Sequence, residues 1–337
     1  MSSRSLGARA AIPAVCGLLM LALLPVATGA QSRGAPARAA AGEVHTLHVQ
    51  GNVYMLITTG APGANVTLQI GDDGVLLVDT SGSQVTSQLV AEIRKLSDKP
   101  IRYIINTHVH ADHTGGNEVL AKMGSTIAGG NVGIGASEGA AVIAHENVLT
   151  RMSAPTGSVA PTPFAAWPTD TFFTAKKELF FNGEAIEIIH QPAAHTDGDS
   201  LAFFRRSDVV SAGDLFSTVT YPIVDLDRGG NIQGVIEGLN RILDITIPKD
   251  KQEGGTYVIP GHGRLCDEAD VLEYRDMVTI IRDRVQNLIA KGSSLDQVKA
   301  AKPTLDYDGR YGSTTGTWTT AQFVEAVYKS LKEKPTK

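Results

Sequence analysis

The residues best suited to chemistry lie in one short stretch of the chain. Four metal-ligand side chains, His108, His110, Asp112 and His113, fall within six residues, and Thr114-Gly115-Gly116 follows them. Imidazole and carboxylate groups together are typical ligands of zinc and similar divalent ions. Side chains alternate along an extended segment, so His108 and His110 share one side, whereas Asp112 and His113 follow a bend. The spacing therefore predicts two pairs of ligands and two metal ions.

Further ligand-type residues recur downstream, each beside glycine, aspartate or threonine. They are His195 in AHTDGDS, Asp214 in AGDLF and His262 in PGHG. The alternative is a chance polar loop or one structural metal. Five of the nine histidines of the chain belong to this set, which disfavours that alternative.

These motifs, in this order over most of residues 45–265, resemble those of the metallo-β-lactamase superfamily. The resemblance implies a first metal site of His108, His110 and His195, a second of Asp112, His113 and His262, and Asp214 as a bridge between them. No position of that ligand set is missing. Asp79, in GVLLVDT, matches the aspartate at a strand end of the family, and we expect it to accept the second ring N–H of a ligand histidine. A turn-capping role is the alternative for Asp79.

Two zinc ions are the expected cofactors, and a di-iron or mixed-metal centre is disfavoured because redox relatives generally carry an added flavin-binding domain. A hydroxide that bridges two such ions exists near neutral pH and is the expected nucleophile. It would attack the carbonyl carbon of a small ester, lactone, thioester or β-lactam. Asp112 is a candidate for proton handling in addition to its role as a ligand.

In the family that this chain resembles, the residue at the position of Asp214 differs from branch to branch. True β-lactamases commonly have cysteine or serine there, whereas glyoxalase II and lactonase relatives have aspartate. The expected function is therefore hydrolysis of a small ester, lactone or thioester. Two alternatives stay open: a true metallo-β-lactamase, and a non-catalytic metal-binding accessory protein.

The first 30 residues read as a cleaved signal peptide. Arg4 and Arg9 precede an apolar run from Ala10 to Val26, and small residues follow it. Pro13 and Pro25 interrupt a run that is already short for a spanning helix, so stable membrane insertion after cleavage is not expected. The sequence predicts an exported protein, either periplasmic or secreted.

The net charge restricts the kinds of partner that the protein can bind, and the cysteine content restricts its disulfides. Loss of Arg4 and Arg9 takes the formal charge from −5 to −7, which disfavours a nucleic-acid partner and a nuclease. Cys266 alone remains after loss of Cys16, so no internal disulfide is expected. A small-molecule substrate fits best, and the oligomeric state stays open.

The elements that must position the ligands follow from the apolar periodicity. After a leader at residues 31–42, residues 43–337 are expected to form one catalytic domain with C-terminal helices. Strands are predicted at residues 46–50, 53–58, 65–70, 75–79 and 101–106, and a second strand-rich block at 171–174, 179–181, 185–190, 201–204 and 209–212. Helices are predicted at 84–96, 138–149, 232–243, 269–290, 295–301 and 320–331. Two strand-rich halves with covering helices predict an α/β fold, a four-layer αββα sandwich.

Candidate substrate contacts lie outside the ligand set. The Pro-rich segment 150–170 is a candidate lid, and it carries Phe164 and Trp167. Anchoring of the segment is the slightly preferred role for those two residues. Tyr221 is a candidate contact, although a packed tyrosine is the commoner case. His145 sits in a helical pattern, where a surface or hydrogen-bonded histidine is the commoner case, although it could reach the cleft.

Overall fold

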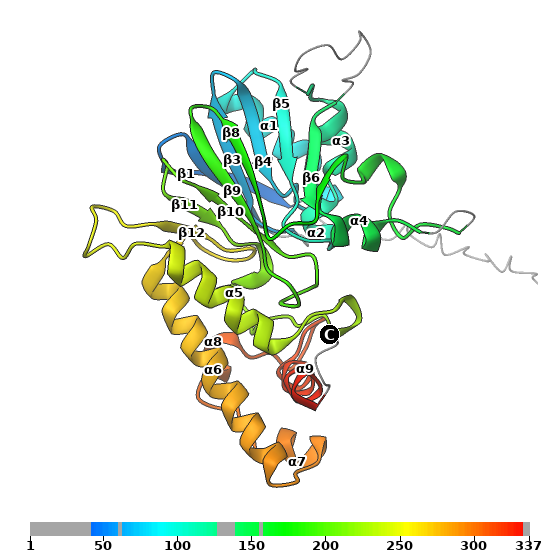
Figure 1. Cartoon of the computed structure of the whole chain (residues 1–337), viewed down its shortest axis with the longest axis vertical. Coiled ribbons are helices and arrows are strands. Elements are labelled where there is room, and N and C mark those ends of the chain that lie inside the picture. The colour runs from blue at the N-terminus through cyan, green and yellow to red at the C-terminus, as the bar shows by residue number, and fades with distance from the viewer. Residues whose placement is uncertain (1–41, 60–62, 127–138, 155–157, 333–337) are drawn as a thin grey trace, which may run out of the picture. The chain divides into compact units, whose positions relative to one another are not determined.

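The computed structural model describes residues 42–59, 63–126, 139–154 and 158–332. The expected signal peptide and residues 31–41 of the expected leader lie outside these described residues. Two facing sheets with helices on their outer faces make up the fold (Figure 1). None of the helices in the described ranges is long and apolar enough to cross a membrane.

The first sheet contains the N-terminal strands. Its strands, in spatial order, are β1 (Glu43–Gln50), β2 (Val53–Thr59), β3 (Val66–Gly71), β4 (Gly74–Val78), β5 (Ile101–Ile105), β6 (Ala141–His145) and β7 (Asp170–Phe172). Strands β1 to β4 pair antiparallel, and β4 to β7 pair parallel. The expected hairpin is confirmed, because β3 and β4 pair up to Gly71 opposite Gly74 across an Asp-Asp turn.

The second sheet contains the later strands. They are β8 (Lys176–Phe181), β9 (Glu184–His190), β10 (Ser200–Phe204), β11 (Val209–Ser211), β12 (Tyr257–Ile259) and β13 (Cys266–Asp267), in the spatial order β13-β12-β11-β10-β9-β8. Only the β11–β12 pair of this sheet is parallel among the described strands. Strands β12 and β13 were not predicted from the sequence, because both are too short to show a period.

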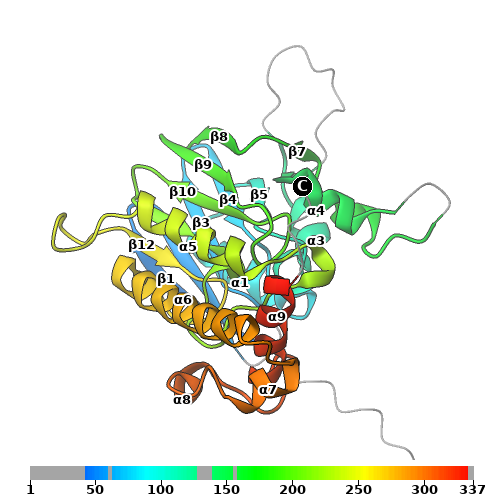
Figure 2. The same cartoon turned by 60° about the horizontal axis from the view of Figure 1, so that its bottom comes forward.

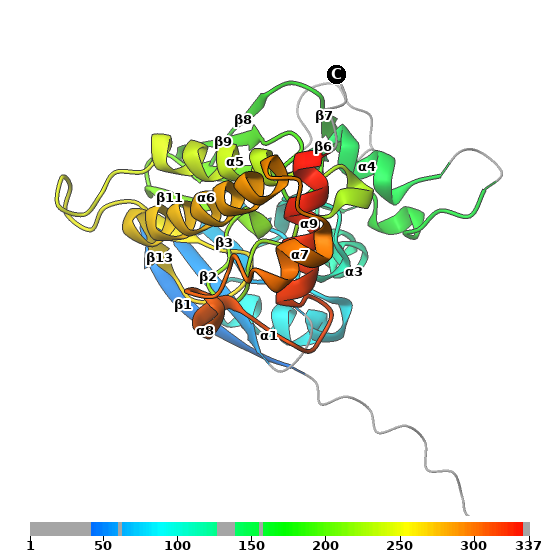
Figure 3. The same cartoon turned by 90° about the horizontal axis from the view of Figure 1, so that it is seen from below.

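Helices cover the outer face of each sheet. The connections between first-sheet strands carry η1 (Ser83–Val85), α1 (Thr86–Leu96), α2 (Ala111–Thr114), α3 (Asn117–Lys122), α4 (Glu146–Met152) and η2 (Phe164–Ala166). The chain after β11 carries η3 (Gly213–Leu215), η4 (Leu226–Arg228), α5 (Ile232–Ile245), α6 (Glu268–Ala290), α7 (Leu295–Ala300), α8 (Asp308–Tyr311) and α9 (Thr320–Lys332). Helices α5 and α6 run across the second sheet (Figure 2), and α9 lies beside α6 and α7 (Figure 3). The predicted four-layer sandwich is confirmed.

Apolar side chains fill the three spaces between these four layers. Met55 and Leu76 of the first sheet meet Ile188 and Phe204 of the second in the central layer. Leu89, together with the rest of the buried face of α1, packs on the outside of the first sheet. Burial of this kind contributes roughly 25 cal/mol for each Å² of apolar surface removed from water, so the layers hold the sheets in fixed register.

Two local expectations are wrong. Within the predicted helix 138–149, residues 141–145 form strand β6, and the helix, α4, begins only at Glu146. The run Ala-Val-Ile-Ala is apolar on both faces because β5 and β7 flank it, and a short buried run has no period that separates strand from helix. Strand β7, expected in the second block, pairs with β6 of the first sheet, because an apolar pattern does not identify the pairing partner.

The parallel pairings bring several strand ends to one edge. Strands β4 and β5 are parallel neighbours, and Asp79 and the segment from Asn106 onward follow their carboxyl ends. Strands β11 and β12 are also parallel neighbours, and η3 and the segment 260–263 follow theirs. Loops at the carboxyl ends of such strands are the usual place for chemistry in α/β folds. The edge therefore collects residues from four strands.

Candidate metal centre

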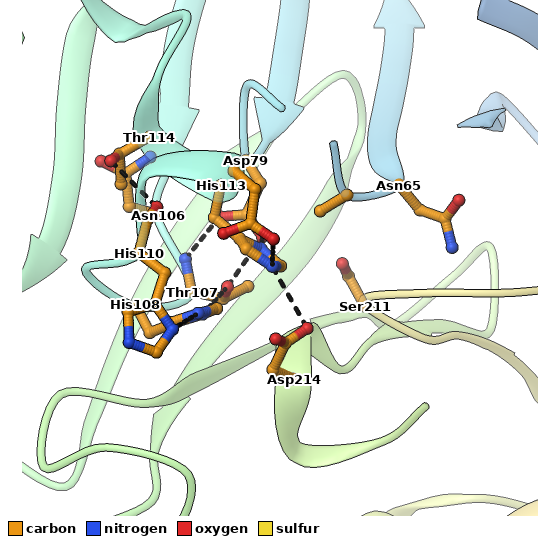
Figure 4. Close-up of polar contacts among 12 residues, drawn as sticks. Asn65, Asp79, Asn106, Thr107, His108, His110, His113, Thr114, Ser211 and Asp214 are labelled. Atoms are coloured by element: carbon orange, nitrogen blue, oxygen red, sulfur yellow. Dashed lines mark hydrogen bonds and ion pairs between the residues drawn. The ribbon is translucent and has the colours of Figure 1, made fainter. Parts of the chain in front are cut away.

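All seven residues expected as ligands meet at this edge. Their nitrogen and oxygen atoms form two groups, and the ligand atoms of each group lie within 4.8 Å of one another. The first group is His108, His110, His195 and Asp214. The second group is Asp112, His113 and His262. Figure 4 shows Asp214 facing His113, with Asp79 at the other end of the His113 ring. The grouping matches the division that the sequence motifs implied.

Ring nitrogens converge in the first group. His110 Nδ1 lies 2.9 Å from His195 Nε2 and 3.2 Å from His108 Nε2. Three imidazole nitrogens this close cannot all satisfy one another by hydrogen bonds, because each neutral ring has one donor and one acceptor. Three lone pairs that point to a common place are the arrangement that a divalent cation requires.

The other nitrogen of each of these rings fixes the tautomer. His195 Nδ1 lies 2.7 Å from the carbonyl oxygen of Ile223, and His110 Nε2 lies 2.8 Å from Asp225 Oδ2. Both oxygens only accept hydrogen bonds, so these nitrogens carry the protons. The inward-facing nitrogens of His110 and His195 are therefore left with free lone pairs.

Asp79 holds two further rings of the site, as expected from its place at the end of β4. Its Oδ2 lies 2.7 Å from His113 Nδ1 and accepts from Thr107 Oγ1 at 2.7 Å, while Oδ1 accepts from Thr107 N at 2.8 Å. Thr107 Oγ1 in turn lies 3.0 Å from His108 Nδ1. Asp79 therefore orients His113 directly and His108 through Thr107.

Asp214 lies between the two groups. Its Oδ1 is 3.2 Å from His113 Nε2 and 3.4 Å from His262 Nε2, and its Oδ2 is 3.7 Å from His195 Nε2. His262 Nε2 is also 3.2 Å from Asp112 Oδ2. The carboxylate of Asp214 thus faces the first group with one oxygen and the second group with the other.

Two buried atoms of the site test whether a metal fits. His113 Nε2 and Asp214 Oδ1 are buried and, among the described residues, neither has a hydrogen-bond partner of acceptable geometry. A buried polar atom without a partner costs about 1–3 kcal/mol, so native proteins rarely contain one. Metal coordination would satisfy both atoms, and the residues therefore fit a metal centre.

The electrostatics of the histidines also suit metal binding. Burial lowers the pKa of His195 to about 4 and lowers the pKa of His108 well below its usual value, so both rings are neutral at pH 7. Burial alone would lower the pKa of His262, but Asp214 and Asp112 raise it to about 9. A metal at the second group must therefore displace a proton, and its affinity should rise with pH up to about 9.

Substitution of Gly261 by alanine is expected to disrupt the centre. A Cβ atom at this position would lie 2.0 Å from Asp214 Oδ1, far inside van der Waals contact. The carboxylate must then turn away from the space between the two groups. We expect the Gly261→Ala protein to fold but to bind less metal, as measured by metal content after dialysis against a zinc buffer. Wild-type metal content would contradict this role of the glycine.

Acidification is expected to destabilise the metal-free protein between pH 6.5 and 4. Burial lowers the pKa of His195, and burial followed by the charge of His145 lowers that of His190, both to about 4. The unfolded chain takes up these protons near pH 6.5, whereas the folded chain does not until about pH 4. The free energy of unfolding should then fall by up to about 1.4 kcal/mol per pH unit for His195 alone.

Urea unfolding of the chelated protein at pH 7, 6, 5 and 4 measures this loss. His190→Phe keeps an aromatic ring in place and removes one titrating group, so the pH dependence should become shallower. His262 acts in the opposite direction above pH 6.5, because its stabilising contribution is complete below that pH and is lost as the pH rises through 9. Equal slopes for the wild type and His190→Phe would show that His190 does not contribute.

The three candidate substrate contacts differ in their surroundings in the structure. Tyr221 is wrong as a substrate contact, because it is 1% exposed and its hydroxyl donates to Thr304 O and Asp308 Oδ1. Trp167 Nε1 donates to Thr162 O, and its ring packs against the small core beside α4, which is the expected anchoring role. Phe164 is exposed, so its contact with substrate stays a prediction.

His145 has the hydrogen-bonded role that was its commoner interpretation, and the candidate lid is described only in part. The His145 ring is buried and stacks on His190 with centroids 3.6 Å apart, and its Nδ1 caps α4 by accepting from Asn147 N. It therefore has a structural role at the end of β6. Residues 155–157 of the segment 150–170 lie outside the described residues, and its role as a lid stays a prediction.

Sequence reasoning missed Asp225 and Thr107 as residues that orient ligands. Thr107 stands beside the histidine cluster, and a hydroxyl residue next to a ligand is a signal that could have found it. Asp225 is 115 residues from His110, and nothing in the spacing of its loop marks it. Only the fold brings the two side chains together.

Comparison with known proteins gives a family and a relative. The profile of the Metallo-beta-lactamase superfamily matches residues 59–262. The linear primary-alkylsulfatase of Pseudomonas sp. (strain ATCC 19151) is 24% identical over 262 residues, which are 67% of this chain and 47% of that protein. The chain thus spans about half the length of this curated relative.

Several solved structures resemble the chain at low sequence identity. The sec-alkylsulfatase Pisa1 from Pseudomonas sp. has a TM-score of 0.58 and 16% identity, over 85% of this chain and 50% of that one. The metallo-beta-lactamase from Pontibacter korlensis has a TM-score of 0.53 and 16% identity, over 70% and 99%. The DIM-1 metallo-beta-lactamase has a TM-score of 0.51 and 18% identity, over 70% and 97%. These likenesses agree with the four-layer fold.

Proposed function

Because the chain belongs to the metallo-beta-lactamase superfamily, we propose that it is a zinc-dependent hydrolase with two metal ions that cleaves small esters. The family is shown by the profile match, and the chain carries a histidine and aspartate cluster able to hold metal. The proposal adds the hydrolytic activity, the metal, the number of ions and the bond that is cleaved.

The position of Asp214 carries this proposal. One carboxylate faces histidines of both groups, and its buried Oδ1 lies within 3.4 Å of two ring nitrogens without a hydrogen bond of acceptable geometry. A single metal at either group would leave part of this carboxylate unsatisfied. Two ions are therefore the better match, with His108, His110 and His195 holding one, Asp112, His113 and His262 the other, and Asp214 both.

The residues of the chain have defined tasks in such a centre. Bound divalent ions would supply Lewis acidity and a water-derived nucleophile at neutral pH. Asp79, Thr107 and Asp225 fix the ring tautomers so that lone pairs face inward. Asp112 is 32% exposed, whereas His113 is fully buried, so Asp112 lies on the open side, where it can handle a proton of the reaction.

Carboxylic esters, lactones and thioesters are the first candidates for the substrate. An aspartate at position 214 makes the shared ligand all-oxygen, and oxygen ligands keep the ions stronger Lewis acids toward a carbonyl than a thiolate would. A β-lactam remains an alternative of the same reaction type. A metal-binding accessory role without turnover would be favoured only if the protein hydrolyses none of these substrate classes.

Sulfate esters are the second candidate class. The linear primary-alkylsulfatase of Pseudomonas sp. matches 67% of this chain, which extends beyond the ligand motifs themselves. We also propose that the protein acts after export, on a small molecule of the periplasm or the surroundings. That part of the proposal depends on the arginines and the apolar run near the N-terminus.

A matched set of substrates tests the proposed function. Octyl acetate and octyl sulfate share one alcohol, so a difference in their hydrolysis reports only the acid that is released. An acyl-homoserine lactone, an acyl thioester and a chromogenic cephalosporin complete the set. Each is incubated with zinc-loaded protein and with protein treated with a chelator.

The outcomes separate the candidate functions. We expect hydrolysis of octyl acetate, the lactone or the thioester that is lost on chelation and restored by zinc. Cleavage of octyl sulfate alone would establish the second candidate. Cleavage of the cephalosporin alone would indicate a functional β-lactamase, and no cleavage in any arm would support the accessory role. Two equivalents of zinc per chain in the active protein would support the metal stoichiometry.

A further inference from the structure

A fully buried asparagine contacts three separate parts of the chain. Asn117 is the first residue of α3, and two glycines separate it from the ligand-bearing helix α2. Its Oδ1 accepts from Thr80 Oγ1 at 2.9 Å and from Asn106 Nδ2 at 3.1 Å. Its Nδ2 donates to Asn106 Oδ1 at 2.8 Å and to Ala166 O at 2.9 Å. An amide offers two donors and two acceptor sites, so the hydrogen-bonding capacity of Asn117 is used in full.

The contact with Thr80 connects Asn117 to the second ligand group. Thr80 follows Asp79 at the end of β4, and its N–H donates to His113 O at 2.7 Å. The hydroxyl of Thr80 also lies 3.0 Å from His113 O, but its single proton can serve Asn117 Oδ1 because the N–H already satisfies that carbonyl. Gly116 N donates to the same hydroxyl at 3.1 Å. The turn from α2 to α3 is therefore fixed to the end of β4, next to the carboxylate that orients the His113 ring.

The contact with Ala166 connects Asn117 to the Pro-rich segment 150–170. Ala166 ends η2 and belongs to a small apolar cluster beside α4, against which Trp167 also packs. Val109, which stands between two ligands of the first group, packs against the same cluster. The described end of the segment thus has an apolar contact beside the first group and a polar contact beside the second.

We propose that Asn117 is a positioning residue that holds the second ligand group and the Pro-rich segment in one arrangement, so that zinc bound at this group also restrains the segment. The path runs from His113 O through Thr80 to Asn117, and from its Nδ2 to Ala166 O. Because coupling is reciprocal, a segment held in this way raises the affinity of the group for zinc. The inference rests on the proposed two-metal centre but does not depend on which bond is cleaved.

Zinc titration against a chromophoric chelator tests the effect on the second group. Asn117→Ala removes the amide and leaves all seven candidate ligands in place. We expect the dissociation constant of one zinc ion to rise about tenfold and that of the other to stay unchanged, because outer contacts of this type are worth about 10- to 100-fold in metal affinity. In a His262→Ala background, which lacks a ligand of the second group, Asn117→Ala should not weaken the remaining zinc ion further.

Fluorescence of Trp167 tests the effect on the segment. The chain has two tryptophans, so in a Trp318→Phe protein only Trp167 emits. We expect zinc to lower the acrylamide quenching constant of Trp167 about twofold in this background and to have no such effect once Asn117→Ala is added. Without metal, quenching should be stronger in the Asn117→Ala protein, because the neighbouring Ala166 O has lost its donor.

Two other buried amides provide matched controls. Asn106→Ala deletes both hydrogen bonds of the amide pair but leaves the contacts of Asn117 with Thr80 and Ala166 in place. Gln69 is fully buried on β3 toward the β3–β4 hairpin, away from Asp79, and donates to Glu184 Oε1 at 2.6 Å. Asn106→Ala and Gln69→Ala should lower the Tm, yet both should keep wild-type zinc affinities and wild-type quenching of Trp167.

The outcomes separate this coupling from general damage to the fold. Wild-type zinc affinities or wild-type quenching in a folded Asn117→Ala protein would overturn the coupling, as would the same two changes in either control variant. If Asn117→Ala does not fold, Asn117→Ser takes its place, since a serine still offers Thr80 an acceptor.

Failure of the proposed function gives a different result. If zinc binds but no substrate is hydrolysed, the proposed function fails and the coupling is unaffected. If the wild type binds no zinc, the proposed centre fails, and quenching of Trp167 in the metal-free proteins decides whether Asn117 holds the segment. Equal quenching with and without the Asn117 amide would then overturn the inference.

Discussion

Replacement of Asp214 by asparagine is expected to lower kcat by at least about 10³-fold and to reduce the bound metal below that of the wild type. The carboxylate lies 3.2 Å from His113 Nε2 and 3.7 Å from His195 Nε2, so its charge acts on both groups. An asparagine amide has nearly the same volume but cannot supply a charged oxygen to each side. Steady-state hydrolysis and metal content on the same preparation measure both effects.

A second buried aspartate provides a matched control for this change. Asp208 is 8% exposed and accepts hydrogen bonds from Thr256 Oγ1 and Gln252 Nε2. It precedes β11, whereas Asp214 follows that strand, so the two carboxylates lie at opposite ends. Asp208→Asn should keep wild-type kcat and metal content even where it lowers the melting temperature. Wild-type activity in a folded Asp214→Asn protein would refute the proposed centre.

Removal of the His110 ring is expected to lower kcat much more than removal of the charge of Asp225, which orients that ring. His110→Ala deletes the nitrogen that converges with His108 and His195, and kcat should fall at least about 10³-fold. Asp225→Asn leaves the ring in place but weakens the contact at His110 Nε2, which is 2.8 Å long. Outer contacts of this type are worth about 10- to 100-fold in metal affinity or activity.

The prediction is decided by which of the two variants loses more activity. Both proteins should remain folded by circular dichroism, since His110 is partly exposed and contributes no apolar core. Excess zinc should restore more activity to Asp225→Asn than to His110→Ala, because only the former keeps every ligand atom. Equal losses in the two variants, both insensitive to zinc, would argue that Asp225 acts as a ligand or reacts itself.

The candidate ligand set could be proposed from the sequence because ligand chemistry depends on residue type. His108, His110, Asp112 and His113 are close in the chain, so their proximity in space needed no fold. Asp214 and His262 were found by motif, and the parallel pairings β4–β5 and β11–β12 explain why those motifs meet. Strand ends in parallel neighbours lie at one edge regardless of the sequence distance between them.

Local periodicity predicted most helices and strands but not their partners. An amphipathic period reports that one face is buried, as on α1 and α9, where Leu89 and Phe323 are fully buried. It does not report what covers that face. Strand β6 was mistaken for helix, and β7 was placed in the wrong sheet, because both facts depend on neighbours that are distant in sequence.

The sequence by itself therefore determined the family resemblance, the four layers and seven candidate ligand side chains. Tertiary structure alone decided that Asp225 reaches His110 and that Tyr221 packs against α9 instead of facing substrate. The physical reason is that residue type fixes what a side chain can bind. Long-range packing of α9 against the loop before α5 fixes what it meets, and no local pattern encodes that packing.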